Sequence, residues 1–303
     1  MRSLPLRRPT LLLGSSGQIG FELMRLLRGS TDVVSPARAE IDLTRPDSVR
    51  HAVRRVQPAV IVNAAGYTAV DRAESERDLC FQVNAEAPGV LAEEARACGA
   101  ILVHYSTDYV FDGAKPVPYV ETDLPGPLNI YGESKLAGER AVQGAGGAHL
   151  VLRTSWVYGP RGTNFPRTIL RLARERSELR VVADQTGTPT SSRTIAAATV
   201  DILYKLFEHG DAMDSAAEWS GIYHVAGSGL ATWYDVAQAV LAADPRANEQ
   251  RCERVLPIPT TEFPTPARRP RYSVLDCTKA RSRFGLTFDD WRFELASVIS
   301  ELA

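Results

Sequence analysis

Leu11-Leu12-Leu13-Gly14-Ser15-Ser16-Gly17-Gln18-Ile19-Gly20 decides the fold, because a strand, a glycine-rich turn and a helix start follow one another there. The leucine run is typical of a buried strand, and residues 21–28 continue with helical periodicity. Glycines permit a tight turn and a close backbone approach, and a helix N-terminus offers N–H groups and a partial positive charge. The pattern therefore predicts that Gly14, Gly17 and Gly20 form a dinucleotide pyrophosphate site; a glycine-rich turn without a ligand is the alternative.

Strand-like and helical segments alternate through the first half of the chain. Further apolar runs lie at 32–35, 58–62, 100–105 and 148–153, and helical patterns start near Pro46, at Asp71 with an interruption around Pro88, and at Tyr131. This alternation predicts an α/β fold of the Rossmann type, a doubly wound parallel sheet with right-handed crossovers.

The character of the sequence changes after Gly159. Helices are expected at 164–178 and 192–208, strands at 180–183 and 221–225, a polar loop at 209–220 and a helix capped by Thr232. We expect a nucleotide-binding domain at 1–158, to which a segment of about 180–208 can return. Residues 159–303 are expected to form mainly a smaller C-terminal α/β region that binds the substrate.

The composition argues against several classes of protein. The 303 residues carry a net charge of -1, which gives no reason to expect nucleic acid or an anionic membrane as a partner. Four cysteines without a C-x-x-C pair and five histidines without metal-ligand spacing predict no metal site. His104 and His224 are expected to be core histidines. The N-terminus lacks a long apolar segment, so we expect a cytoplasmic protein without a signal peptide or membrane span.

The second strand suggests which nucleotide binds. NAD sites place an acid at its tip, whereas here it ends Val34-Ser35-Pro36-Ala37-Arg38. A hydroxyl and a guanidinium suit a 2′-phosphate, so we expect NADPH, with NADH as a possible substitute; a solvated Arg38 is the alternative. Asp42 either accepts a hydrogen bond from adenine or caps a turn. After the strand at 58–62, small residues at Ala64, Ala65 and Gly66 leave room for a ligand.

Tyr131 and Lys135 stand four residues apart at the start of a predicted helix, so they share one face. A nearby ammonium favours the phenolate and lowers the pKa of a tyrosine, which suits proton transfer to or from a carbonyl or alcohol. Surface helices also carry this spacing by chance. Here it follows the strand that ends in Ser106-Thr107-Asp108, and hydroxyl groups at a strand's carboxyl end are expected to take part in chemistry.

Together these stretches resemble the extended short-chain dehydrogenase/reductase family, and within it the reductases of dTDP-linked 4-keto sugars. The resemblance spans nearly the whole chain. It is carried by residues 14–20, Asn63-Ala64-Ala65 with residues 67–71, 106–113, Asn129-Ile130-Tyr131-Gly132 with residues 135–139, 153–158, Asp184-Gln185 with residues 187–190, and Tyr223-His224 with residues 226–227.

The resemblance implies an activity and a set of roles. It implies NADPH-dependent reduction of dTDP-6-deoxy-L-lyxo-4-hexulose at the 4-keto group to dTDP-L-rhamnose. It assigns Tyr131 as proton donor, Lys135 as the anchor of the nicotinamide ribose, and Thr107 as a hydrogen-bond partner of the carbonyl oxygen. The implied cofactor contacts beyond these are Gly17, Gln18 and Ile19 at the pyrophosphate, Asp42 and Leu43 at the adenine, and Gly66, Tyr67 and Thr68 at the nicotinamide. The implied sugar contacts are Thr107, Asp108, Tyr131 and Trp156.

Some positions depart from the family. Arg193 stands where members that form a magnesium-bridged dimer have an acid, so we expect no such metal and a monomer or homodimer. Arg268, Arg269 and Arg271 either meet a pyrophosphate or form a solvated basic turn. The alternative functions are another nucleotide-sugar ketoreductase, epimerase or dehydratase, and a non-catalytic subunit like the regulatory subunit of methionine adenosyltransferase. Tyr109 follows Thr107-Asp108 where dehydratases have an acid, which disfavours a dehydratase.

Overall fold

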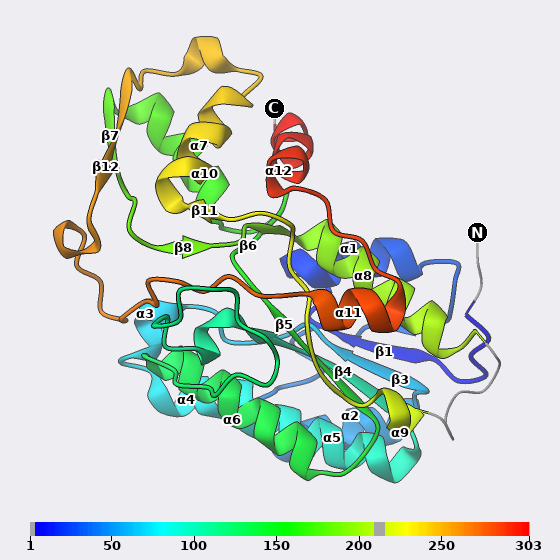
Figure 1. Ribbon diagram of the computed structural model, residues 1–303. Helices are drawn as coiled ribbons and strands as arrows, with labels where there is room; N and C mark the ends of the chain where they lie inside the picture. Colours follow the sequence, from blue (N-terminus) through cyan, green and yellow to red (C-terminus); the bar gives the residue numbers. More distant parts are fainter. Residues whose placement is uncertain (1–3, 209–215, 303) are drawn as a thin grey trace.

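A six-stranded parallel sheet forms the centre of the molecule (Figure 1). The structure is a computed structural model and describes residues 4–208 and 216–302. The strands run in the order β10-β5-β4-β3-β1-β2, and each pairing is parallel. Their bounds are β1 (Thr10–Leu13), β2 (Val33–Val34), β3 (Val60–Asn63), β4 (Ile101–Thr107), β5 (His149–Thr154) and β10 (Gly221–His224). The predicted doubly wound parallel fold is confirmed.

Helices cover both faces of this sheet, because alternate side chains of each strand point to opposite sides. Leu12 packs in a core with α1 (Gln18–Leu27), α8 (Ser192–Leu206) and α11 (Thr278–Phe284). Leu11 and Leu13 pack in a second core with α2 (Pro46–Val56), α5 (Ala87–Cys98) and Val142 of α6 (Ile130–Gly144). Figure 1 shows these two groups of helices on opposite sides of the sheet. Because the strands are parallel, their carboxyl ends meet at one edge of the sheet, where sheets of this kind bind their ligands.

The segment predicted to be helical over 71–97, with an interruption around Pro88, is divided into more pieces than expected. It forms α3 (Val70–Ala73), α4 (Arg77–Phe81), a π-helical turn at Gln82–Glu86, and α5. Pro88 lies in the first turn of α5, where a missing N–H interrupts no helical hydrogen bond. The break expected around Pro88 thus begins six residues earlier, at the π turn.

A smaller region packs around its own core. It contains α7 (Phe165–Glu175), α10 (Trp233–Ala242), α12 (Trp291–Ser300) and the parallel pair β7 (Glu178–Val182) and β12 (Arg254–Ile258). Short pairs join β6 (Val157–Tyr158) to β9 (Thr190–Ser191) and β8 (Thr186–Gly187) to β11 (Ala231–Thr232). The predicted cap is confirmed, because the Thr232 side chain accepts from Asp235 N in a capping box.

The two regions alternate along the chain. Helix α8 packs against α1, and β10 pairs with β5, so both lie with the central sheet although they follow residue 158. The short helix α9 (Ala216–Trp219) leads into β10, and the remainder of the loop predicted at 209–220 falls mostly outside the described residues. The division of the chain at residue 158 stays a prediction.

Candidate active site

The glycine-rich turn is shaped so that only glycine fits at its ends. Gly14 has φ +80°, and a Cβ there would lie 2.7 Å from the Ala64 carbonyl carbon. A Cβ at Gly20 would lie 2.1 Å from the Gly14 carbonyl oxygen. Helix α1 begins at Gln18 with Gly17 as its N-cap, and no side chain caps it. This end of α1 fits a pyrophosphate, since backbone N–H groups and the helix dipole both favour an anion.

The tip of β2 lies against this turn. The Ser35 hydroxyl donates to Ser15 Oγ at 2.7 Å, and Arg38 is exposed. The exposed guanidinium is therefore available for a 2′-phosphate, although no contact in the structure assigns it. Asp42 Oδ1 accepts from Thr44 N (2.9 Å) and Thr44 Oγ1 (2.7 Å), and these bonds lower the pKa of Asp42. Asp42 thus caps a turn, and a contact with adenine stays a prediction, as it does for the half-buried Leu43.

The loop after β3 is fixed by Asn84, the buried amide of the π turn. Asn84 Oδ1 accepts from Tyr67 N at 2.8 Å, and Asn84 Nδ2 donates to Tyr67 O at 2.9 Å. The Tyr67 hydroxyl donates to Glu76 Oε2 at 2.6 Å, and Gly66 and Thr68 remain exposed. The side chain of Asn84 thus pairs with the backbone of the loop at which the nicotinamide is predicted to lie.

Thr107 and Tyr131 meet at the carboxyl end of β4. A Cβ at Gly132 would lie 2.3 Å from Tyr109 O, so glycine allows α6 to begin directly against the residues that follow β4. Asn129 caps α6 by accepting from Gly132 N at 2.8 Å. The Tyr131 ring makes an edge contact with Tyr109 at 5.9 Å between ring centroids. Burial raises the pKa of Tyr131 above its usual value, and the hydrogen bond with Thr107 acts in the opposite direction.

Lys135 points into the protein below this pair. Its Nζ donates to Tyr105 O at 2.5 Å and lies 3.4 Å from His104 Nε2, and His104 Nδ1 lies 3.2 Å from Asn63 Nδ2. Burial lowers the pKa of Lys135 to about 8, against the charge of Glu139, which raises it. Sequence reasoning placed His104 in the core but missed its contact with Lys135, because 31 residues separate them.

The pKa of Tyr131 differs from the one expected from its spacing to Lys135. The sequence suggested that Lys135 lowers the pKa of Tyr131, but Lys135 is not among the groups that shift this pKa, and burial raises it. Burial therefore favours the neutral phenol of Tyr131 at neutral pH. The end of β3 lies between the glycine-rich turn and Lys135. Ala64 packs against Gly14, and Asn63 contacts His104, which in turn contacts Lys135.

Asp108 is enclosed rather than open to a ligand. Only 2% of its surface is exposed, and its carboxylate accepts from Thr107 Oγ1 (3.1 Å) and Ser155 Oγ (3.0 Å). Burial raises the pKa of Asp108 to about 6, and the hydroxyls of Ser273, Ser155 and Thr107 oppose that shift. In this arrangement the one hydroxyl hydrogen of Thr107 goes to Asp108, so donation to a substrate carbonyl requires the hydroxyl to turn. Direct contact of Asp108 with a sugar stays a prediction.

Trp156 lies between β5 and β6 and is partly buried in an aromatic stack. Its ring lies parallel to Trp233, with centroids 3.5 Å apart and an angle of 3° between the planes. Sequence reasoning missed Trp233, because a lone tryptophan at a helix start gives no signal of its partner. A hydrogen bond joins Thr107 to Tyr131, and Lys135 follows one turn later on α6, whereas no hydrogen bond or ring contact joins Trp156 to these three within the described residues.

The three arginines of the basic turn at 268–271 differ in their contacts. Arg269 donates from both Nη atoms to the Asp71 carboxylate, at 3.1 and 2.8 Å, and is only partly exposed. Asn129 Nδ2 donates to Arg268 O at 2.7 Å and so holds this turn beside the start of α6. Arg268 and Arg271 are exposed, so of the three arginines these two are the ones with side chains open to a phosphate.

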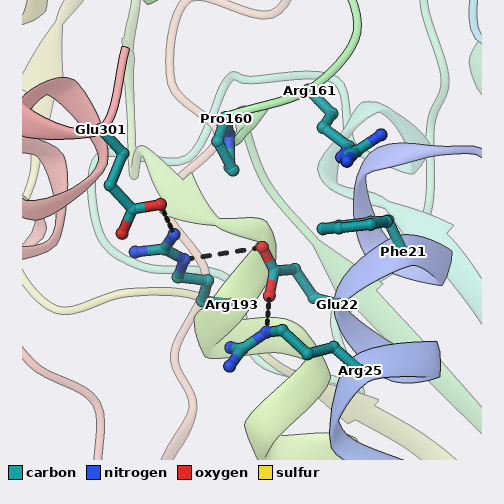
Figure 2. Close-up of a pocket in the computed structure, with 7 residues that line it drawn as sticks. All are labelled: Phe21, Glu22, Arg25, Pro160, Arg161, Arg193 and Glu301. Carbon is teal, nitrogen blue, oxygen red and sulfur yellow. Dashed lines mark hydrogen bonds and ion pairs between the residues drawn. The ribbon is translucent and has the colours of Figure 1, made fainter. Parts of the chain in front are cut away.

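A cavity of about 600 Å³ lies outside this site, between α1, α8, the loop after β6 and the C-terminal residues (Figure 2). Arg193 lies between two carboxylates there: its Nε is 3.5 Å from Glu22 Oε1, and its Nη2 pairs with Glu301. Arg25 Nε also bonds Glu22, at 3.0 Å. A guanidinium thus occupies the space between these acids. Across residues 4–208 and 216–302, no group of three or more His, Cys, Asp or Glu side chains is arranged to hold a metal ion.

The family model described as RmlD substrate binding domain matches residues 8–303. The chain is 46% identical over 295 residues to dTDP-4-dehydrorhamnose reductase of Burkholderia thailandensis, covering 96% of this chain and 98% of that protein.

Two solved structures are similar as well. The fold matches the crystal structure of dTDP-4-dehydrorhamnose reductase from Bacillus anthracis in complex with NADP, with TM-score 0.88 and 34% identity, covering 98% and 100% of the two chains. It also matches Thermus thermophilus UDP-glucose 4-epimerase in complex with NAD, with TM-score 0.76, 23% identity and coverage of 97% and 98%, which is a likeness of fold alone. None of the helices in the described part of the chain has the length and apolar character needed to cross a bilayer.

Proposed function

Since this chain belongs to the RmlD substrate binding domain family, we propose that it is an NADP-dependent oxidoreductase that reduces a dTDP-linked 4-keto sugar. The specific reaction is the reduction of dTDP-6-deoxy-L-lyxo-4-hexulose at C4, which gives dTDP-L-rhamnose. The observation that carries the proposal is the contact of Tyr131 with Thr107 at the carboxyl end of β4, with Lys135 one helical turn farther along α6.

The nucleotide would be held by the edge of the sheet. The N-terminus of α1 at Gly17, Gln18 and Ile19 would hold its pyrophosphate, and the exposed Arg38 would pair with its 2′-phosphate. Bound there, NADPH supplies a hydride to the sugar carbonyl carbon. The Bacillus anthracis relative was solved with NADP, which supports this choice over NADH as the preferred cofactor.

Tyr131 acts as the proton donor. Because burial raises its pKa, the phenol keeps its proton at neutral pH and can give it to an oxygen that gains negative charge. Thr107 lies beside it and stabilises that charge once its hydroxyl turns from Asp108. Lys135 holds the ribose hydroxyls and places a cation near the phenolate that forms. In these roles Tyr131 gives up the proton, and Lys135 stabilises the phenolate that remains.

Another nucleotide-sugar ketoreductase or epimerase remains the second candidate. The likeness to the Thermus epimerase supports it at the level of the fold. An epimerase returns its hydride to the substrate, so it produces no net NADPH oxidation, whereas the proposed reductase consumes one NADPH per sugar. A regulatory subunit would bind a partner protein and oxidise no NADPH.

The test is the nicotinamide absorbance of a mixture of protein, NADPH and dTDP-6-deoxy-L-lyxo-4-hexulose, followed over time and pH. Net oxidation together with dTDP-L-rhamnose among the products is expected. Folded protein that oxidises no NADPH at any pH would exclude the reductase. Tyr131→Phe should nearly abolish turnover and leave NADPH binding intact, whereas Tyr109→Phe, which keeps the neighbouring ring, is the matched control. If Tyr131→Phe retains most of the activity, the proton donor is another group.

A further inference from the structure

Trp156 has an unusual backbone conformation. Its φ is +45°, and among the described residues the other non-glycine residue with positive φ is Gln57, a helix C-cap where this conformation is ordinary. Trp156 instead lies between β5 and β6, and a bulky side chain with positive φ is strained. Such strain persists only where surrounding contacts hold it, and it gathers at ligand sites.

Two neighbours set the position of the indole. Trp233 lies parallel to it at 3.5 Å between centroids. On β8, a Cβ at Gly187 would lie 2.4 Å from Trp156 Cε2, so any side chain there would push the ring away. The β8–β11 pairing places Gly187 opposite Ala231, two residues before Trp233, and so brings both neighbours to the same place.

Trp233 is itself fixed by the smaller region. Its Nε1 donates to Gln185 Oε1 at 3.2 Å, and Gln185 Nε2 donates to Thr260 Oγ1 at 3.0 Å. Phe165 of α7 packs against Trp233 with centroids 4.7 Å apart. The capping box of Thr232 and Asp235 fixes the first turn of α10, in which Trp233 lies. Trp233 is therefore held by contacts other than Trp156 and is able to act as a fixed support.

We propose that Trp233 is a positioning residue for the sugar, because its stack holds Trp156 in the strained conformation that forms the apolar wall of the sugar site. The inference rests on the proposed function, since it deepens the role of Trp156 there. An aromatic wall suits a ligand with exposed C–H groups, such as a 6-deoxy sugar. We expect no contact between this wall and NADPH. Trp233 also belongs to the smaller region, so the stack joins that region to the end of β5.

The experiment compares Trp233→Leu, Trp233→Phe and the control Trp219→Phe, which alters a tryptophan stacked on Phe284 instead. Trp233→Leu should raise the sugar KM about tenfold, as expected for loss of an aromatic stack, and leave the NADPH KM unchanged. Trp233→Phe keeps an aromatic face and should restore most of the sugar affinity. Trp219→Phe should change neither constant. An unchanged sugar KM in folded Trp233→Leu would overturn the proposal.

A spectroscopic measurement separates this proposal from the proposed activity. Two parallel indoles in contact couple their transitions, so the wild type should show an exciton couplet in circular dichroism. Trp233→Phe should remove the couplet, Gly187→Ala should weaken it by displacing Trp156, and Trp219→Phe should leave it unchanged. A couplet that survives Trp233→Phe would overturn the positioning role, even if the reductase assay succeeds. If the couplet behaves as expected and no sugar is reduced, the proposed function fails and the stack stands.

Discussion

Replacing Lys135 with methionine should stabilise the protein in the absence of nucleotide. Lys135 is 6% exposed, and burial lowers its pKa from 10.5 to about 8. A shift of about 2.5 units at 1.36 kcal/mol per unit corresponds to about 3 kcal/mol of destabilisation at neutral pH. Methionine fills a similar volume without a charge. It also loses the bond from Nζ to Tyr105 O, which costs about 1 kcal/mol net, so the expected gain is about 2 kcal/mol.

The sign of the pH dependence identifies the cause. Below about pH 8 the folded protein carries the buried ammonium and its full penalty. Between about 8 and 10.5 the unfolded chain binds more protons than the folded one, so the wild type gains stability as the pH rises. The advantage of Lys135→Met should therefore be present at neutral pH and disappear toward pH 10.5.

Urea unfolding of both proteins at neutral and alkaline pH measures this difference, because other titrating groups are common to both and cancel. Lys205→Met is the control, since Lys205 is half exposed in an ion pair with Glu208 and should change stability little. A variant less stable than the wild type at neutral pH would refute the reasoning. A gain that is the same at both pH values would mean that packing, and not the buried charge, is the cause.

Three other charged side chains allow further predictions. Arg38→Ala should raise the KM for NADPH and leave that for NADH unchanged; equal effects on both in steady-state assays would remove the 2′-phosphate contact. Arg153→Met leaves the fully buried Glu139 carboxylate without its bidentate partner, so urea unfolding should show a loss of about 3–5 kcal/mol, largely recovered in the double variant with Glu139→Leu. Because burial raises the pKa of Asp108 from 3.8 to about 6, the folded state takes up a proton at a higher pH than the unfolded chain, and the wild type should gain about 2 kcal/mol relative to Asp108→Asn as the pH falls from about 7 to 4. An equal response of the two proteins to pH would contradict the burial of that charge.

The fold was predictable because its signals are local. A strand, a glycine turn and a helix in ten residues at Leu11–Gly20 indicate one βα unit, and repetition of that unit indicates a parallel sheet. The pairing of β10 with β5 was not predictable, since an apolar run at 221–225 does not indicate which strand it pairs with. The π turn before Pro88 was likewise not predictable, and neither were the hydrogen bonds of its Asn84 with the Tyr67 backbone, 17 residues away.

The site was predictable as a set of residue types and less so as electrostatics. Spacing alone placed Tyr131 and Lys135 on one helix face, and the strand pattern placed Thr107 nearby. The pKa of each group depends on how deeply its side chain is buried, and the spacing of residues in the sequence does not show that depth. For that reason the expected lowering of the Tyr131 pKa gave way to a rise. The contacts of Lys135 with His104 and of Trp156 with Trp233 were invisible for the same reason.

Burial shifts the groups at this site toward their neutral forms. It favours the phenol of Tyr131, the uncharged imidazole of His104, the amine of Lys135 and the carboxylic acid of Asp108. An ionised group at such a site is costly for the fold, because burial removes the water that would solvate its charge. The site is well suited to chemistry that creates charge, since an oxyanion formed there meets poorly solvated donors whose interactions are stronger than in water. The instability predicted for Lys135 and the proton-donor role proposed for Tyr131 are thus two consequences of one burial.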